Sequence, residues 1–395
     1  MCPHTGARRT WYRMRPRPDR RGDAVSAILP VKMPKWGLSM QEGKIVHWWK
    51  VPGEEIGEGD DLVDVETTKI TNTVESTGTG TLRRIVAAKD QTLPVGALLA
   101  VIANATTPDD EIDRFVEEWQ TNFVPESDET ARTSALELRM VEVAGRALRV
   151  GVTKGQGIPV VLLHGFGADL DNWLFNIDAL AAAAPVIAID LPGHGASTKD
   201  VGNASIATLA ESVVGVLDTL GVSKAHLVGH SLGAAVALLL ALNQPPRVGT
   251  LTLIAPAGLP GTRVSEDFLT GFVEAERRQQ LKPVLEMLVV EPGLVSRDMV
   301  DNVLKSKRLD GAQEALLKLR DRILAGDDFH ALQARLSRWP PALIIAGRKD
   351  AIVTGLADAS LPPNWRIAWI DDAGHMPHVE RAGVVNRLIL ARIEP

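Results

Sequence analysis

The sequence predicts a multidomain protein in which a small all-β barrel of two pseudo-symmetric halves precedes an α/β domain with a helical cap. Three observations support this fold class: an internal repeat of β runs in the first hundred residues, alternating β runs and helical patterns after residue 136, and a helical insertion at about 258–335. The length of 395 residues also exceeds that of one typical domain. We expect a disordered leader at 1–30, the barrel at 31–104, a linker at 105–135 and the α/β domain at 136–395.

The composition excludes several classes of protein. A net charge of −6 argues against a broad nucleic-acid surface, and no run approaches the roughly 18 apolar residues of a membrane span. Cys2 is the only cysteine, so no disulfide can form within the chain, and we expect a reducing, cytoplasmic location. The Arg- and Pro-rich leader lacks the apolar core of a secretory signal. We interpret it as a disordered extension or a start placed too far upstream, with a transit peptide or a nucleic-acid arm as alternatives.

The barrel prediction rests on a repeat with a period of 37 residues. Residues 43–65 lie over residues 80–102 without a gap, so that Gly43 meets Gly80 and Val65 meets Ile102. Each copy reads as a strand, a turn-rich stretch and a second strand. Two copies are too few for a solenoid, and each is too small to hold a core alone, so the repeat predicts one flattened barrel.

The segment that joins the two copies contains Lys69 in the turn "ETTK". A tight connection between β runs projects from one end of a module, so Lys69 is either a solvated hairpin lysine or a functional one. Residues 31–104 resemble lipoyl domains through "MPKWGLSMQEGKI", "GEEIGEGD", "VETTKITN" and "LPVGALLAVI". The resemblance implies lipoate in amide linkage on Lys69. Thr68 and Ile70 flank this lysine where biotinyl domains carry Met, although Thr68 also replaces the acidic residue that is commoner in lipoyl domains.

The acidic linker contains a short amphipathic helix. We predict Thr107 as its N-cap, Pro108 at its first position and Asp110 at capping-box spacing. The helix has two interpretations: its apolar stripe packs on its own domain, or it docks another subunit. The stripe consists of Ile112, Phe115, Val116, Trp119 and Phe123.

From residue 136 onward, apolar β runs end in Gly-rich loops and alternate with helical patterns, which is typical of a mostly parallel sheet covered on both faces. "GHSLG" (229–233) follows the run "AHLV" and opens the apolar helix "AAVALLLAL". This strand-then-helix context is what a nucleophile elbow requires, and it predicts Ser231 as a nucleophile.

A serine nucleophile needs a base, and the base needs an orienting acid. In this fold the order is Ser, acid, His, and both Asp350 and His375 follow β runs at the sheet edge where sites collect. We therefore predict Asp350 and His375 as the triad partners. The weaker candidates are His378, His230, His164, Asp371 and Asp372.

An oxyanion hole needs two backbone N–H groups. We predict them at Leu232, directly after Ser231, and at Phe166 in "HGFG". His164 of this loop has two interpretations, a functional residue or a structural one that only holds the loop in place. The helical insertion should form a cap that shapes the pocket. We predict no metal site.

Residues 136–395 resemble the α/β-hydrolase superfamily through "HGFG", "DLPGHGAS", "GHSLG", "GRKD" and "AGHMP". A lipoyl-like module, an acidic linker and this domain, in that order, resemble the acyltransferase components of acetoin dehydrogenase complexes. The resemblance implies a dihydrolipoyllysine-residue acetyltransferase that moves an acetyl group from S-acetyl-dihydrolipoyl-lysine to coenzyme A in acetoin catabolism. The implied partners are a thiamine-diphosphate-dependent acetoin dehydrogenase component and dihydrolipoamide dehydrogenase, with the chain itself in a homo-oligomer.

Several alternatives stay open from the sequence. Acetyl could pass through Ser231 or go directly to coenzyme A. The second domain could be a (thio)esterase that uses water as the acceptor, the triad could be vestigial, or the carrier could serve another 2-oxo acid complex. The H-x-x-x-D-G motif of pyruvate-dehydrogenase-type acyltransferases is absent, because Ser306 stands where its His would be before Asp310 and Gly311.

Overall fold

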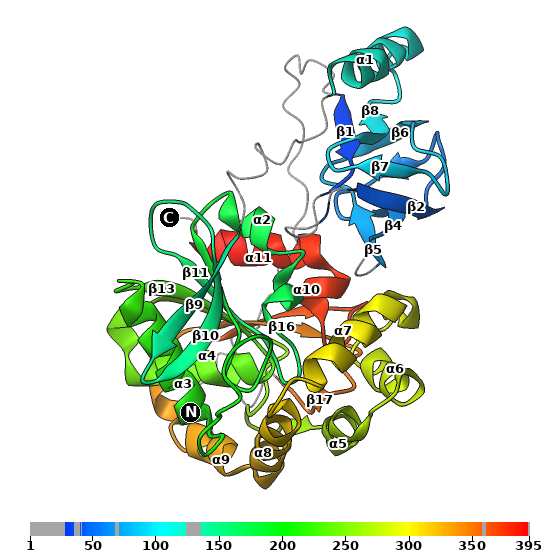
Figure 1. Cartoon of the computed structure of the whole chain (residues 1–395). Helices are drawn as coiled ribbons and strands as arrows, with labels where there is room; N and C mark the ends of the chain where they lie inside the picture. The colour runs from blue at the N-terminus through cyan, green and yellow to red at the C-terminus, as the bar shows by residue number, and fades with distance from the viewer. Residues whose placement is uncertain are drawn as a thin grey trace, which may run out of the picture.

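The computed structural model describes residues 28–393 apart from 35–39, 41, 68–70, 124–135 and 358–360. The described residues form a barrel domain, which includes the helix α1, and a larger α/β domain (Figure 1). Most of the predicted leader, Lys69 and the second half of the predicted linker lie outside the described residues.

The barrel domain consists of two four-stranded sheets, with strand orders β1-β8-β6-β3 and β5-β4-β2-β7. A shift of 37 residues carries β2 onto β6 and β4 onto β8, and the short strands β3 and β7 also correspond. β3 pairs with β6, and β7 pairs with β2, so the short strand of each copy completes the sheet of the other. Neither half can close its core alone, which confirms the predicted two-half barrel. The strands are β1 (Leu29–Lys32), β2 (Glu42–Trp48), β3 (Glu55–Ile56), β4 (Asp61–Glu66), β5 (Thr71–Glu75), β6 (Gly80–Ile85), β7 (Thr92–Pro94) and β8 (Leu98–Ala103).

The helix α1 (Asp109–Asn122) packs on the barrel domain itself. Its Ile112 is fully buried and contacts the β8 residues Leu98 and Val101, with Phe115 and Trp119 partly buried beside it. Of the two interpretations of the stripe, the structure therefore supports packing on its own domain.

The predicted N-cap of α1 is wrong. Pro108 is the N-cap residue, and it makes no side-chain capping hydrogen bond. Thr107 is instead part of the turn after β8: its backbone N–H donates to the carbonyl of Asn104 at 3.0 Å, and Arg83 Nη1 donates to the Thr107 carbonyl at 2.6 Å. Arg83 Nη2 also donates to Asp109 at 2.6 Å, so an arginine from β6 holds the start of the helix.

The α/β domain is built on an eight-stranded sheet with the order β18-β16-β14-β13-β11-β12-β10-β9. The hairpin of β9 and β10 is antiparallel, and the other six strands are parallel to one another. The strands are β9 (Glu137–Val143), β10 (Arg146–Val152), β11 (Val160–Leu163), β12 (Val186–Ile189), β13 (Ala225–His230), β14 (Val248–Ile254), β16 (Leu343–Gly347) and β18 (Arg366–Ile370).

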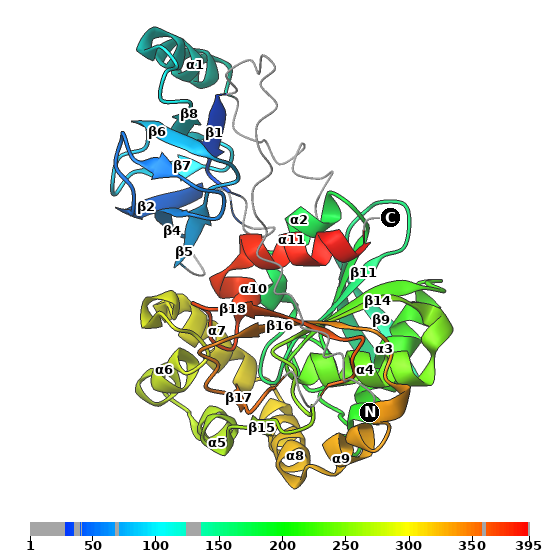
Figure 2. The ribbon, with the colours of Figure 1, turned by 180° about the vertical axis from the view of Figure 1, so that it is seen from behind.

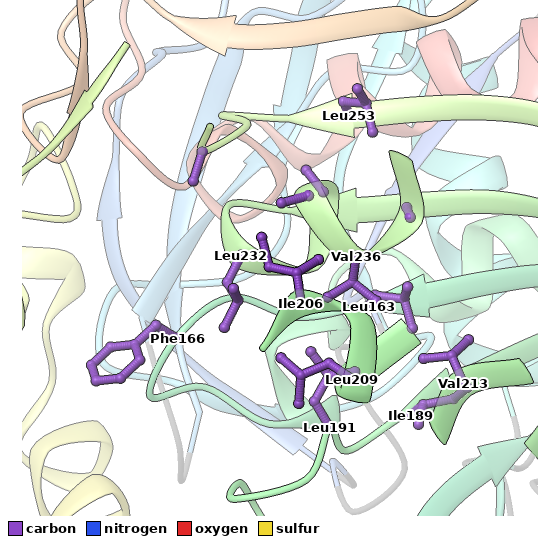
Figure 3. Close-up of a cluster of buried hydrophobic side chains, with 14 of the residues drawn as sticks. Leu163, Phe166, Ile189, Leu191, Ile206, Leu209, Val213, Leu232, Val236 and Leu253 are labelled. Carbon is purple, nitrogen blue, oxygen red and sulfur yellow. The ribbon is translucent and has the colours of Figure 1, made fainter. Parts of the chain in front are cut away.

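Helices cover both faces of this sheet, because alternate residues of each buried strand point to opposite sides (Figure 2). Val161 and Leu163 face the cluster that includes α3 and α4, while Val160 and Leu162 face the cluster that includes α2 and α11. Figure 3 shows part of the first cluster. The helices are α2 (Ile177–Ala181), α3 (Ile206–Thr219), α4 (Leu232–Asn243), α10 (Pro377–Glu380) and α11 (Ala382–Ile393).

The helical insertion lies between the neighbouring strands β14 and β16 and forms the cap. Its first strand, β15, pairs with β17 (Val353–Thr354), which follows Asp350 in the chain. This pairing ties the cap to the loop of a predicted triad residue. The cap contains β15 (Arg263–Val264), α5 (Glu266–Glu274), α6 (Arg278–Glu286), the 3₁₀ helix η4 (Pro292–Leu294), α7 (Arg297–Lys307), α8 (Ala312–Ala325) and α9 (Asp327–Gln333).

In the part of the chain that the structure describes, no helix combines the length and the apolar character needed to cross a membrane. The same residues contain no group of three or more His, Cys, Asp or Glu side chains placed to hold a metal ion.

Candidate active site

Ser231 stands on a sharp turn between β13 and α4. Its φ of 52° and ψ of −112° are unusual for a residue with a side chain, and it is 7% exposed. The flanking glycines are required by close approach of the backbone. A Cβ on Gly229 would lie 2.3 Å from the carbonyl oxygen of Gly233, and one on Gly233 would lie 2.2 Å from that of Leu163. The motif therefore has the geometry of a nucleophile elbow.

His375 and Asp350 are joined by a hydrogen bond. Nδ1 of His375 lies 2.9 Å from Oδ2 of Asp350, and His375 is 2% exposed. The other carboxylate oxygen, Oδ1, accepts from the backbone N–H groups of Ile352 at 2.8 Å and Val353 at 2.9 Å. The carboxylate is thus fixed on both sides, and it leaves Nε2 as the ring nitrogen of His375 available to a serine. His375 and Ser231 line the same cavity.

Glu380 holds the loop that carries His375. Its Oε1 accepts from the backbone N–H of Gly374 at 2.8 Å and of Met376 at 3.3 Å, on either side of the histidine. Its Oε2 accepts from the N–H of Val290 in the cap at 2.7 Å. Burial raises the pKa of Glu380, while these three N–H donors lower it. Sequence reasoning missed this residue, because no motif marks it and its cap partner Val290 lies 90 residues away in the chain.

Two of the weaker histidine candidates support His375 instead of replacing it. His230 Nε2 donates to the carbonyl of His375 at 2.9 Å, and the His230 ring also lies against that of His378, with centroids 4.5 Å apart. Asn172 Nδ2 donates to His378 Nε2 at 3.0 Å. Burial lowers the pKa of His378 to about 3 and lowers that of His230 as well, so both rings are neutral at pH 7.

The other weaker candidates have partners of their own. Asp372 pairs with Arg381 at 2.6 Å, and Asp371 pairs with Arg348 at 3.2 Å with 89% of its side chain exposed. His164 is fully buried: Nδ1 bonds to the carbonyl of Gly165 at 2.8 Å, and Nε2 accepts from the N–H of Leu191 at 3.0 Å. It fixes the "HGFG" loop, the structural role expected from the sequence.

The N–H groups of Phe166 and Leu232 donate to no protein group among the described residues. Leu232 is the first residue of α4, where an N–H has no partner within the helix. Phe166 lies at the edge of the cluster in Figure 3, toward the cap, and its ring is 5.6 Å from that of Phe272 in α5. Both residues line the cavity with Ser231. Two free N–H groups beside a nucleophile are the elements of an oxyanion hole.

The cavity has a volume of about 200 Å³ and lies between the strand ends and the cap. Most of its lining is apolar, including Phe268, Leu288 and Val303 from the cap. Polar side chains also line the cavity, among them Asp169, Asn172 and Lys199. The Nζ of Lys307, another lining residue, donates to the backbone carbonyls of Phe272, Val273 and Ala275. Burial lowers the pKa of Lys307 to about 8. Because these three carbonyls lie at the end of α5, Lys307 fixes α7 to α5 and does not point a free charge at a substrate.

The predicted carrier residue, Lys69, lies outside the described residues together with Thr68 and Ile70. The strands on either side of it are described: β4 and β5 are antiparallel, and Glu66 pairs with Thr71. The ladder therefore fixes both ends of the segment 67–70, which closes the hairpin.

Comparison with known proteins agrees with both domains. A family model described as the alpha/beta hydrolase fold matches residues 158–382, and one described as biotin-requiring enzyme matches residues 29–102. A Pseudomonas putida protein named dihydrolipoyllysine-residue acetyltransferase component of acetoin cleaving system is 46% identical, with 93% of this chain and 99% of that one covered. A protein of the same name from Cupriavidus necator is 41% identical, with 92% and 96% covered. A solved meta-cleavage product hydrolase shares the fold, with a TM-score of 0.58 and 24% identity over 64% of this chain and 97% of that one.

Proposed function

The chain belongs to the family of dihydrolipoyllysine-residue acetyltransferase components of acetoin cleaving systems, and we propose that it transfers an acetyl group from S-acetyl-dihydrolipoyl-lysine to coenzyme A through Ser231. One observation carries this proposal. The same chain holds a barrel whose hairpin turn contains Lys69 and an elbow serine in a capped cavity with a His375–Asp350 pair. A carrier and a nucleophile joined in one chain are suited to acyl transfer.

The roles of the protein groups follow from their positions. His375 Nε2 takes the proton of the Ser231 hydroxyl as its oxygen forms a bond to the carbonyl carbon of the acetyl thioester. The N–H groups of Phe166 and Leu232 stabilise the negative charge that develops on the carbonyl oxygen. The carbon–sulfur bond then breaks, and the leaving sulfur takes the proton from His375. The result is an acetyl ester on Ser231.

The second half reverses these steps with a different thiol. His375 Nε2 removes the proton of the coenzyme A thiol, the sulfur attacks the ester, and Ser231 recovers its proton from His375 as the ester bond breaks. Asp350 keeps the proton of the imidazole on Nδ1 in the neutral state, so that Nε2 is the basic atom in both halves. The apolar cap lining reduces access of water, which would otherwise compete as acceptor.

The carrier group is lipoate on Lys69, and when bound it supplies a dithiol that holds the acyl group as a thioester. The relatives are named as components of an acetoin cleaving system, and partners in a complex follow from that name. We further propose that a thiamine-diphosphate-dependent acetoin dehydrogenase component loads the acetyl group and that dihydrolipoamide dehydrogenase reoxidises the dithiol. A cytoplasmic homo-oligomer fits the single cysteine and the exposed apolar side chains of Leu138 and Met140 on the edge strand β9.

The test compares acceptors with a soluble donor. Purified chain is mixed with S-acetyl-dihydrolipoamide in the presence and absence of coenzyme A, and release of free thiol and acetyl-CoA is followed. We expect rapid thiol release only with coenzyme A and a matching yield of acetyl-CoA. Equal thiol release without coenzyme A, accompanied by free acetate, would instead identify a (thio)esterase with an attached carrier. An unchanged rate in Ser231→Ala would assign the transfer to another route.

A further inference from the structure

The barrel domain contacts the α/β domain through charged groups at one end of the Lys69 hairpin. We call Glu58, Asp61 and Glu75 the acidic patch. These residues lie where β4 begins and β5 ends. Asp61 Oδ2 lies 3.8 Å from Arg381 Nη2, and Glu58 Oε1 lies 3.7 Å from Arg387 Nε. Glu58 and Asp61 thus each face an arginine of opposite charge, and Arg381 also pairs with Asp372 of its own domain at 2.6 Å.

Two glycines also lie at this contact. A Cβ added to Gly383, at the start of α11, would lie 2.5 Å from Glu75 Oε2, and one added to Gly59 would lie 3.5 Å from Arg387 Nη2. The strand β5 also lies next to η4 of the cap. Figure 1 and Figure 2 both show the barrel domain beside α10 and the cap helix α7. Gly383 therefore leaves space at the point where Glu75 of the acidic patch approaches α11.

We propose that Arg381, Arg387 and Gly383 form a docking site for the acidic patch of the chain's own barrel domain. This site holds the barrel domain reversibly next to the loop of His375. Arg381 directly follows α10, and α10 contains Glu380, which fixes that loop. The docked barrel domain is therefore held beside the loop that carries His375.

The geometry of the hairpin explains why this contact does not block the carrier. Asp61 pairs with Glu75 at the docked end of the hairpin, whereas Glu66 pairs with Thr71 at the end that bears Lys69. The two ends are separated by about 15 Å at roughly 3.3 Å per strand residue. Docking at one end leaves the other end free to carry its group to the cavity or to another protein.

The contact is also weak enough to release. The two ion pairs are partly exposed, with 44% of the Arg387 side chain and 53% of the Glu58 side chain accessible. Pairs of this kind shift an equilibrium by up to about five-fold each, and salt screens them. In addition, Glu75 Oε2 is buried at the contact without a hydrogen-bond partner, which opposes docking when the carboxylate is charged. A carrier that must also visit partner enzymes needs such a reversible site.

The docking site can be tested without any acetyl chemistry. In the full-length chain, isotope-edited relaxation measures the rotational correlation time of the barrel domain separately from that of the α/β domain. At low salt we expect one common value, and in Arg387→Glu we expect the barrel value to fall toward that of a small independent module. The charge swap Glu58→Arg with Arg387→Glu should restore the common value.

Two further variants sharpen the test. Gly383→Val places a side chain against Glu75 and should release the barrel domain even though it changes no charge. Arg366→Glu is the matched control: Arg366 is an exposed arginine of the same domain and forms no ion pair among the described residues, so its reversal should leave tumbling unchanged. Independent tumbling of the two domains in the wild-type chain at low salt would overturn the proposal, as would no response to Arg387→Glu and Gly383→Val.

The docking does not depend on the proposed acetyl transfer, but its catalytic consequence does. Transfer from the chain's own carrier should lose rate in Arg387→Glu and at high salt, while transfer from free S-acetyl-dihydrolipoamide should keep its rate. A loss with both donors would indicate damage to the active site. If the variants release the barrel domain as expected but no chain transfers acetyl, the docking proposal stands and the proposed function is refuted.

Discussion

Replacement of Asp350 by Asn removes one charge from the proposed triad without changing its shape. Oδ1 of Asp350 accepts from two backbone N–H groups, at 2.8 and 2.9 Å, so the amide oxygen of the substituted side chain must occupy that position. The amide NH₂ group then faces His375 Nδ1 in place of Oδ2, which is 2.9 Å from it now. A donor at this point forces Nδ1 to become an acceptor, and the ring proton moves to Nε2.

The expected loss follows from this change of tautomer. With the proton on Nε2, His375 cannot accept the proton of Ser231, so both halves of the transfer lose their base. Triads with this substitution lose about 10⁴-fold in rate, which corresponds to about 5 kcal/mol at about 1.36 kcal/mol per tenfold. The oxyanion N–H groups of Phe166 and Leu232 are not altered, so a residual rate above the uncatalysed reaction should remain.

The assay is single-turnover transfer from S-acetyl-dihydrolipoamide to coenzyme A, with thermal unfolding measured in parallel. Asp371→Asn is the matched control, since Asp371 is a neighbouring carboxylate whose side chain is 89% exposed. We expect Asp371→Asn to keep full rate and Asp350→Asn to lose at least about 10³-fold with little change in stability. A rate for Asp350→Asn within tenfold of wild type would refute the assignment of Asp350.

Three further predictions concern stability. Gly233→Ala places a Cβ 2.2 Å from the carbonyl oxygen of Leu163, and it should lower the free energy of unfolding by about 1–3 kcal/mol and abolish transfer. Ile112→Ala removes a fully buried side chain between α1 and β8, and it should cost the barrel domain about 2–4 kcal/mol by thermal unfolding. Burial raises the pKa of Glu75 from its usual 4.5 to about 7, so the native state binds more protons than the unfolded state between these pH values. The free energy of unfolding should therefore fall as the pH rises from 4.5 to 7. Glu75→Gln should remove this fall and be more stable than wild type above pH 7.

A specific result would contradict each of these predictions. An unchanged melting temperature and activity in Gly233→Ala would mean that the elbow can relax. A loss of less than about 0.5 kcal/mol in Ile112→Ala would mean that α1 does not contribute to the barrel core, and the exposed Glu118→Ala gives the baseline for helix substitutions. Parallel stability–pH curves for wild type and Glu75→Gln would show that Glu75 titrates as an exposed carboxylate does.

Local signals in the sequence predicted the fold, and they also selected the candidate site residues. Gly229, Ser231 and Gly233 lie within five residues, and their strand-then-helix context is visible without any distant contact. The repeat similarly predicted both halves of the barrel, because each copy keeps the same apolar and glycine positions. Asp350 and His375 needed only the order of elements in the fold, since both follow adjacent strands of the sheet.

Features that depend on long-range contacts could not be predicted in this way. The bond from Val290 to Glu380 spans 90 residues, and the bond from His230 to His375 spans 145. No periodicity or motif marks these pairs. The N-cap of α1 was wrong for a related reason: Thr107 had the right local pattern, but Arg83 on a distant strand uses its carbonyl in the preceding turn.

The central claim is that the acetyl group passes through Ser231. The most direct test is rapid-quench mass spectrometry of the full-length chain after mixing with S-acetyl-dihydrolipoamide in the absence of coenzyme A. We predict one acetyl group on the peptide that contains Ser231, its disappearance on addition of coenzyme A at the rate at which acetyl-CoA forms, and no adduct in Ser231→Ala. Transfer to coenzyme A at full rate with no acetyl on Ser231 at any time point would contradict the account.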